Sequence, residues 1–180
     1  DEVSNALAAH TWFEFGGVEP NPKIETLRKA IDVVRAENIN FILAVGGGSV
    51  IDGAKLVAAA AQYNGDAWDL LNKQVELKTA LPLGVVLTLA ATGSESNMIA
   101  VISNQTTQEK RSFRSAVVRP RFAILNPCYL QSLPQRQLQN GLVDAFVHVC
   151  EQYLTYPVGG LVQDGYAITV LKTLHHLAEH

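Results

Sequence analysis

The sequence is poor in cysteine, in clustered positive charge and in long apolar runs, and each scarcity excludes a class of protein. Its two cysteines, Cys128 and Cys150, are too few for the disulfide framework of a small secreted domain, so we expect buried, inert thiols in a reducing cytoplasm. The 14 basic and 17 acidic residues give a formal net charge of −3, which provides no basic field for nucleic acid. The longest apolar stretch, residues 54–61, is short and contains Lys55, so no membrane span is predicted.

The composition that remains is typical of a folded globular protein, with 48% hydrophobic and 17% charged residues in a chain of 180. The first nine residues, DEVSNALAA, have helical spacing but no capping residue before them. They contain neither an initiator methionine nor the order of basic, apolar and small residues that marks a signal peptide. We therefore expect a trimmed chain whose helix begins earlier.

The first half of the chain alternates between strand and helix patterns. Asn21 and Pro22 suit the N-cap and the first position of an amphipathic helix. The expected elements are a strand at 11–15, a helix to about residue 38, a buried strand at 41–45 and an alanine-rich helix at 49–62. A strand, helix, strand, helix order predicts an α/β fold with a parallel sheet.

Strands become rare beyond residue 130, where both remaining segments have helical periodicity. The elements expected here are strands at 83–89 and 122–125, a hairpin formed by 98–103 and 110–113, and helices at 136–153 and 162–178. The change from α/β to all-α predicts a domain boundary near residue 130.

A run of three glycines followed by serine, Gly46 to Ser49, lies between a buried strand and a helix. Glycines there let the backbone approach a ligand, and the free N–H groups of the helix start favour an anion such as phosphate. A tight turn without a ligand explains the same residues equally well, because a lone glycine-rich loop is a weak signal. On the following helix, Asp52 is a candidate for contacting ribose or nicotinamide, and Lys55 is expected to be solvated.

A hydroxyl-rich segment, LTLAATGSES at 87–96, follows the next apolar strand and contains Thr88 and Thr92. Open α/β sheets bind ligands at this end of their strands. A serine/threonine turn that caps a helix has the same appearance, so the segment alone leaves both interpretations open.

Asp144 and His148 are four residues apart in a predicted helix and therefore share one face. A carboxylate and an imidazole in that arrangement can be two ligands of a divalent metal. A buried hydrogen bond or an exposed ion pair between them is the more frequent meaning of an isolated D-x-x-x-H pattern. The remaining histidines near the end, His175, His176 and His180, are expected at the surface or in the tail.

Four segments together resemble, in order and spacing, the iron-containing (group III) alcohol dehydrogenase family, and most closely its branch of NADPH-dependent butanol dehydrogenases and aldehyde reductases. They are FGGVEPNP at 15–22, AVGGGSVIDGAK at 44–55, LTLAATGSES at 87–96 and NGLVDAFVHVCEQYLT at 140–155. The resemblance implies a Rossmann-like, parallel-sheet nucleotide-binding domain at 1–130 that lacks its first βα unit. It also implies the truncated start of a helical metal-binding domain at 131–180, and a whole polypeptide about twice this length.

The resemblance also assigns roles to individual residues. Pyrophosphate would bind at the glycine run, Asp52 would lie near the nicotinamide ribose and Lys110 would hold ribose hydroxyls. The implied cofactor-binding residues are Gly46, Gly47, Gly48, Ser49, Asp52, Thr88, Thr92 and Lys110. Asp144 and His148 match the first two metal ligands, through which they would be catalytic, and the family's two further histidines have no counterpart in this sequence.

The implied function is an oxidoreductase that interconverts small alcohols and aldehydes by hydride transfer with NADP(H) or NAD(H), assisted by a divalent metal, iron or zinc. With half of the metal site missing, the chain by itself is expected to be inactive, and the protein is expected to be a cytoplasmic homodimer. Two alternatives stay open. One is an enzyme of the glycerol dehydrogenase or dehydroquinate synthase type, and the other is a non-catalytic nucleotide-binding or assembly module.

Overall fold

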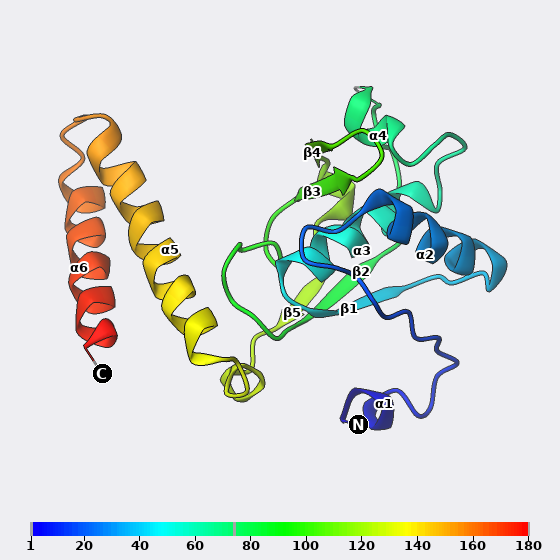
Figure 1. Cartoon of the computed structure of the whole chain (residues 1–180), viewed down its shortest axis with the longest axis horizontal. Helices are drawn as coiled ribbons and strands as arrows, with labels where there is room; N and C mark the ends of the chain where they lie inside the picture. Colours follow the sequence, from blue (N-terminus) through cyan, green and yellow to red (C-terminus); the bar gives the residue numbers. More distant parts are fainter. Residues whose placement is uncertain (1, 74, 180) are drawn as a thin grey trace.

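A computed structural model of the chain describes residues 2–73 and 75–179. It consists of an α/β body followed by a pair of helices that extends away from it (Figure 1). The α-helices are α1 (Glu2–Ala6), α2 (Ile24–Ala36), α3 (Gly48–Ala60), α4 (Asp69–Asn72), α5 (Gln135–Thr155) and α6 (Leu161–Ala178). The strands are β1 (Ile42–Gly46), β2 (Leu83–Leu87), β3 (Ile99–Asn104), β4 (Glu109–Arg114) and β5 (Phe122–Ile124), with short 3₁₀ turns η1 (Ala116–Val118) and η2 (Pro127–Leu130).

The main sheet has the strand order β1-β2-β5, and both pairs are parallel. The register places Ile42 opposite Leu83, and Gly84 opposite Phe122. Helix α3 connects β1 to β2 in the βαβ arrangement that parallel pairing requires. The expected α/β class with a parallel sheet is confirmed.

Helix α3 is the centre of the body and is buried on most of its circumference. One side packs against the sheet, where Ile51 contacts a cluster that includes Ala44 and Val85. The other side packs against α2 and the β3–β4 hairpin in a larger cluster. The alanines at 58, 59 and 60 are at most 2% exposed, which explains why the helix is rich in this small residue.

Two expectations for the first 25 residues are wrong. Residues 11–15 form no strand, and Trp12, Phe13 and Phe15 are exposed. The alternating pattern suits a pleated surface, but a strand needs a neighbour to pair with, and none of the described residues pairs with this segment. Asn21 is not the N-cap of α2, because its φ is 56° and the helix begins at Ile24 with Lys23 as N-cap.

The later expectations hold with small shifts. The hairpin at 98–113 is confirmed, with Asn104 opposite Glu109, while β2 ends at Leu87 instead of residue 89. The interpretation of both cysteines as buried is wrong for Cys128, which is exposed, while Cys150 is half-buried. Cys128 lies in η2, a turn on the surface between the body and α5.

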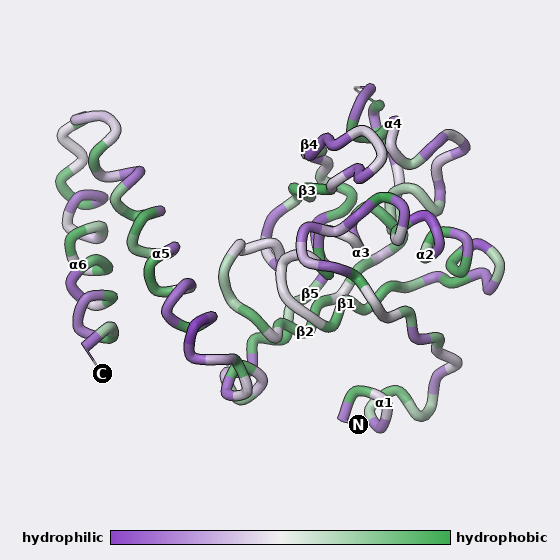
Figure 2. The backbone as a smooth tube through the Cα atoms, viewed as in Figure 1, coloured by the Kyte–Doolittle hydropathy of each residue, from purple (hydrophilic) through white to green (hydrophobic). Residues whose placement is uncertain are grey.

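Helices α5 and α6 pack against each other and stand apart from the body (Figure 1). Figure 2 shows hydrophobic residues along both helices, and Val143, Val147 and Leu154 are among those that are exposed. Among the described residues, no helix combines the length and apolar character that a membrane crossing requires.

Helix α3 covers one face of the sheet, and the opposite face carries exposed apolar side chains. Phe41 stacks on Phe122 across Gly84, with ring centroids 6.1 Å apart, and both rings are at least 40% exposed. Val45 and Ile124 extend this apolar face and are 41% and 46% exposed. In the described chain, β1 and β5 each pair on one side alone, which leaves two strand edges available.

We therefore expect the 180-residue chain to self-associate, because apolar sheet faces and unpaired edges pair with other copies. Light scattering of a dilution series should show dimers or larger species. Val45→Lys, which places a charge on this face, should lower the average mass. Val158→Lys is the matched control, since Val158 is 74% exposed in the connection between α5 and α6. A parent chain that is monomeric at all concentrations would contradict the expectation.

Candidate active site

The glycine run forms the turn from β1 into α3. Gly46 ends β1, Gly47 is the N-cap of α3 without any side-chain cap, and Gly48 is the first helical residue. The first amides of a helix have no partner inside it, so this turn presents N–H donors at the positive end of the helix dipole. The turn lies at the carboxyl edge of the parallel sheet, where open α/β sheets bind their ligands.

The loop at 88–97 closes over this turn. The Thr88 amide donates to the Gly46 carbonyl at 3.1 Å, which continues the β1–β2 pairing by one residue. A Cβ on Gly48 would lie 2.4 Å from Thr92 Oγ1, and one on Gly47 would lie 3.1 Å from Leu89 Cβ. The glycines therefore permit a close approach of the loop to the turn.

Lys55 is not solvated, contrary to the sequence-based interpretation. Its side chain is fully buried, and its Nζ donates to Ser94 Oγ at 2.8 Å, to Asn97 Oδ1 at 2.9 Å and to the Ile99 carbonyl at 2.8 Å. Burial lowers the pKa of Lys55 from 10.5 to about 8, although the nearby carboxylates of Asp52 and Glu95 favour the charged form.

Asp52, one turn before Lys55, is held in the same network. Its Oδ1 accepts from the Ser94 hydroxyl at 2.6 Å, and its Oδ2 accepts from the Val101 amide at 2.9 Å. Both carboxylate oxygens therefore already have a partner within the chain. The predicted contact between Asp52 and ribose stays a prediction, and it would use the remaining lone pairs of these oxygens.

Lys110 and Ser49 are brought together by Asn21. The Lys110 Nζ donates to the side-chain Oδ1 of Asn21 at 2.8 Å. The backbone N–H of Asn21 donates to Ser49 Oγ at 3.3 Å. The backbone of Asn21 is left-handed, with a φ of 56°, and asparagine tolerates that conformation better than most residues do. A hydroxyl and an ammonium thus converge beside the glycine turn.

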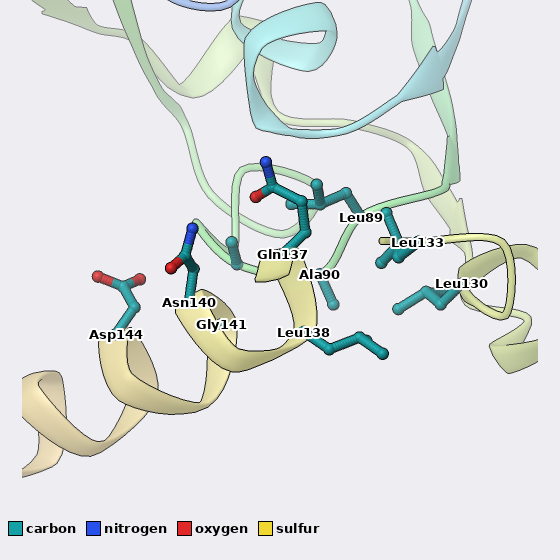
Figure 3. Close-up of a pocket in the computed structure, with 10 residues that line it drawn as sticks. Leu89, Ala90, Leu130, Leu133, Gln137, Leu138, Asn140, Gly141 and Asp144 are labelled. Carbon is teal, nitrogen blue, oxygen red and sulfur yellow. The ribbon is translucent and has the colours of Figure 1, made fainter. Parts of the chain in front are cut away.

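A cavity of about 330 Å³ separates the 88–97 loop from α5 (Figure 3). Leu89, Ala90 and Ala91 line it on the loop side. Gln137, Asn140 and Asp144 supply the polar side chains on the α5 side, and Leu130, Leu133, Leu138 and Gly141 complete it. An apolar pocket with a few polar groups on one wall is the usual form of a small-molecule site.

The Asp144 and His148 side chains lie side by side, with Asp144 Oδ1 and His148 Nε2 3.6 Å apart. They are 50% and 60% exposed, so the pair is open to solvent at the edge of the cavity instead of buried in the helix pair. An oxygen and a nitrogen donor suit a divalent cation. No third His, Cys, Asp or Glu in the part of the chain that the structure describes completes a metal-binding group.

Sequence reasoning missed three members of this site: Asn21, Ser94 and Asn97. Their roles depend on partners 28 to 89 residues away in the chain, as in the bond from Lys110 to Asn21, and no local pattern shows such pairing. A signal did exist for Lys55. Asp52 and Lys55 are the two charged residues in an otherwise small and apolar helix, and charges in such a setting indicate buried, partnered groups.

The fold and site together define an α/β dinucleotide-binding type of domain followed by helices with two candidate metal ligands. The family model described as "Iron-containing alcohol dehydrogenase" matches residues 1–127. The chain belongs to the iron-containing alcohol dehydrogenase family.

Individual relatives agree with this assignment. The chain is 54% identical over 177 residues to the NADPH-dependent aldehyde reductase YqhD of Escherichia coli, covering 97% of this chain and 46% of that protein. It is 43% identical over 162 residues to NADH-dependent butanol dehydrogenase A of Clostridium acetobutylicum, covering 90% and 42%. The crystal structure of E. coli YqhD superposes with a TM-score of 0.89 at 53% identity, over 96% of this chain and 45% of that one. The chain thus spans about half the length of these relatives.

Proposed function

We propose that this chain is the cofactor-binding part, with the first metal-ligand helix, of an enzyme that interconverts alcohols and aldehydes by hydride transfer with NADP(H) or NAD(H). The observation that carries the proposal is the glycine turn of α3 with Thr92, Ser49 and Lys110 converging beside it. The relatives named as an NADPH-dependent reductase and an NADH-dependent dehydrogenase support a nicotinamide cofactor.

In this proposal the pyrophosphate lies on the amides of Gly47, Gly48 and Ser49 at the start of α3, where the helix dipole stabilises its charge. Lys110, an exposed cation on β4, donates to ribose hydroxyls, and Thr88 and Thr92 contact the adenine side and the phosphates. The nicotinamide ring then extends toward the cavity between the loop and α5. With the domains that we propose at 1–130 and 131–180, that cavity would lie between the two.

Asp144 and His148 would supply the first two ligands of a divalent metal, iron or zinc, beside this cavity. When bound, such a metal polarises a substrate carbonyl or stabilises an alkoxide. The chain's own residues orient the substrate there: Leu89 and the adjacent alanines exclude water from one wall, and Gln137 and Asn140 offer amide groups on the other. Small alcohols and aldehydes are the substrates that we propose for the whole enzyme, which we infer to be a cytoplasmic homodimer.

Titration of the chain with NADPH and with NADH, followed by nicotinamide fluorescence, tests the cofactor assignment. We expect saturable binding, and Lys110→Met should weaken it about tenfold, since a hydrogen bond from a charged group contributes about 1.5 kcal/mol or more. Lys172→Met, a change of an exposed lysine on α6, is the matched control and should bind as the parent does. A parent chain that binds neither cofactor would contradict the proposal.

A further inference from the structure

Lys55 is a fully buried cation to which the proposed chemistry gives no role. An ammonium has three N–H donors, and all three donate to the chain itself, at Ser94, Asn97 and Ile99. Lys55 therefore has no donor left for a phosphate or a substrate. Its function must therefore lie in the segment that contains its three acceptors.

The three acceptors belong to one segment, which runs from the second half of the 88–97 loop into β3. Asp52 adds two more points of attachment to the same segment, at the Ser94 hydroxyl and the Val101 amide. Ser94 is shared, since its Oγ accepts from Lys55 and donates to Asp52. Asp52 and Lys55 of α3 thus fix this segment at four of the eight residues from 94 to 101: 94, 97, 99 and 101.

The beginning of the loop is held separately, by strand β2 and by the hydrogen bond from Thr88 to Gly46. Between the two attachments, Leu89 and Thr92 are the side chains closest to Gly47 and Gly48. Leu89 to Ala91 also form one wall of the cavity beside Asp144. The position of residues 89–92 therefore sets both the space beside the glycine turn and the width of the cavity.

We propose that Lys55 is a positioning residue for the cofactor: together with Ser94 and Asp52 it holds the 88–97 loop against α3, so that the glycine turn and the adjoining cavity are already shaped for a dinucleotide before it binds. The inference rests on the proposed function. Preorganisation of this kind raises the affinity for the cofactor, because no binding free energy is lost in ordering the loop.

Lys55→Met tests the inference, because methionine fills similar space without donating a hydrogen bond. The main core contacts of α3 remain in this variant, and Ser94 and Asn97 keep one partner each, Asp52 Oδ1 and the Ile99 amide. We expect a folded chain with a mobile loop. The dissociation constant for NADPH should rise at least about tenfold in the folded molecules, while Lys78→Met, a change of an exposed lysine, should leave it at the parent value.

Ser94→Ala separates positioning from mere packing. Ser94 Oγ links Lys55 to Asp52, so Lys55→Met and Ser94→Ala should each weaken NADPH binding. The double variant, which carries both substitutions, should weaken binding by less than the product of the two single effects. Hydrogen exchange of the Ile99 and Val101 amides should become faster in Lys55→Met and stay unchanged in Lys78→Met. Parent-like NADPH affinity in Lys55→Met would overturn the inference while leaving the proposed function intact.

The pH dependence of unfolding checks that the buried group is charged. The pKa of Lys55 is about 8 in the folded chain, against 10.5 when solvated, and the charged groups that face it are the carboxylates of Asp52 and Glu95. As the pH rises, Lys55 loses its proton at a lower pH in the folded state than in the unfolded state. Folding therefore becomes progressively more favourable as the pH rises from about 8 to 10.5. The unfolding equilibrium constant of the parent should fall relative to that of Lys55→Met by up to about tenfold per pH unit.

Unchanged exchange at Ile99 and Val101 in Lys55→Met would overturn the role of Lys55, whereas a parallel pH dependence of the two proteins would overturn only the lowered pKa. If the parent binds neither NADPH nor NADH, the proposed function fails. The exchange measurement needs no cofactor, so it then still decides whether Lys55 holds the loop.

Discussion

Gly47→Val should lower the affinity of the chain for NADPH or NADH at least about 100-fold, while the chain still folds. The valine side chain would stand at the N-cap of α3, where backbone amides otherwise meet the phosphates. The backbone itself tolerates the change, because Gly47 has φ −90° and ψ −170°, an extended conformation open to any residue.

The valine at position 47 would also contact the 88–97 loop too closely. An ideal Cβ at position 47 lies 3.1 Å from Leu89 Cβ, so the neighbouring chain must shift by a few tenths of an ångström. Overpacking of this degree costs about 1–3 kcal/mol of stability, which thermal unfolding would detect without loss of the fold. Gly48 is a poorer choice for the test, because a Cβ there would lie 2.4 Å from Thr92 Oγ1 and would displace the loop outright.

Gly16→Val is the matched control, since a Cβ on Gly16 meets no atom within 4 Å. Fluorescence titration of the three proteins with both cofactors gives the comparison. Gly16→Val should bind as the parent does. Equal affinity in Gly47→Val and in the parent would remove the assignment of the glycine turn as a phosphate site.

The elements that the sequence predicted well are those whose pattern reflects their own burial. The boundaries of strand β1 and helix α3 were predicted within one or two residues, because the apolar run and the alanine-rich pattern are local signals. The expectation that the strand at 41–45 is buried holds for one face alone, since Val45 is 41% exposed on the face away from α3. The segment at 11–15 has an equally good strand pattern but lacks a neighbour among the described residues. Pairing is a tertiary property, and a single segment cannot reveal it.

The site divides in the same way. The glycine turn and the spacing of Asp144 and His148 are local, and the structure places them as their spacing requires. The environment of Lys55 was mispredicted because its acceptors are 39 to 44 residues away. A buried network of this kind is visible in a sequence only as a charge that breaks an apolar pattern.

The 180-residue chain should show no measurable turnover of short aldehydes with NADPH or NADH, even where it binds the cofactor. A metal that activates a carbonyl needs about three protein ligands and one open position. Asp144 and His148 offer two, and no further His, Cys, Asp or Glu in residues 2–73 and 75–179 lies where it would complete the group. A metal bound by two half-exposed side chains dissociates readily, so the polarising charge would be absent when hydride must move.

A protein extended at both ends to the length of its relatives should recover metal-dependent aldehyde reduction. In that protein, Asp144→Ala and His148→Ala should each lower kcat/KM at least about 100-fold, because each removes a ligand and with it the stabilisation of the developing alkoxide. His175→Ala is the matched control. His175 is 71% exposed on α6, where its nearest acidic partner is Glu179, and its loss should leave the rate unchanged. Initial rates of the 180-residue chain and of the extended protein, with and without added metal, test this prediction. Equal turnover by the two proteins would mean that two ligands suffice, and the requirement for a larger metal site would be wrong.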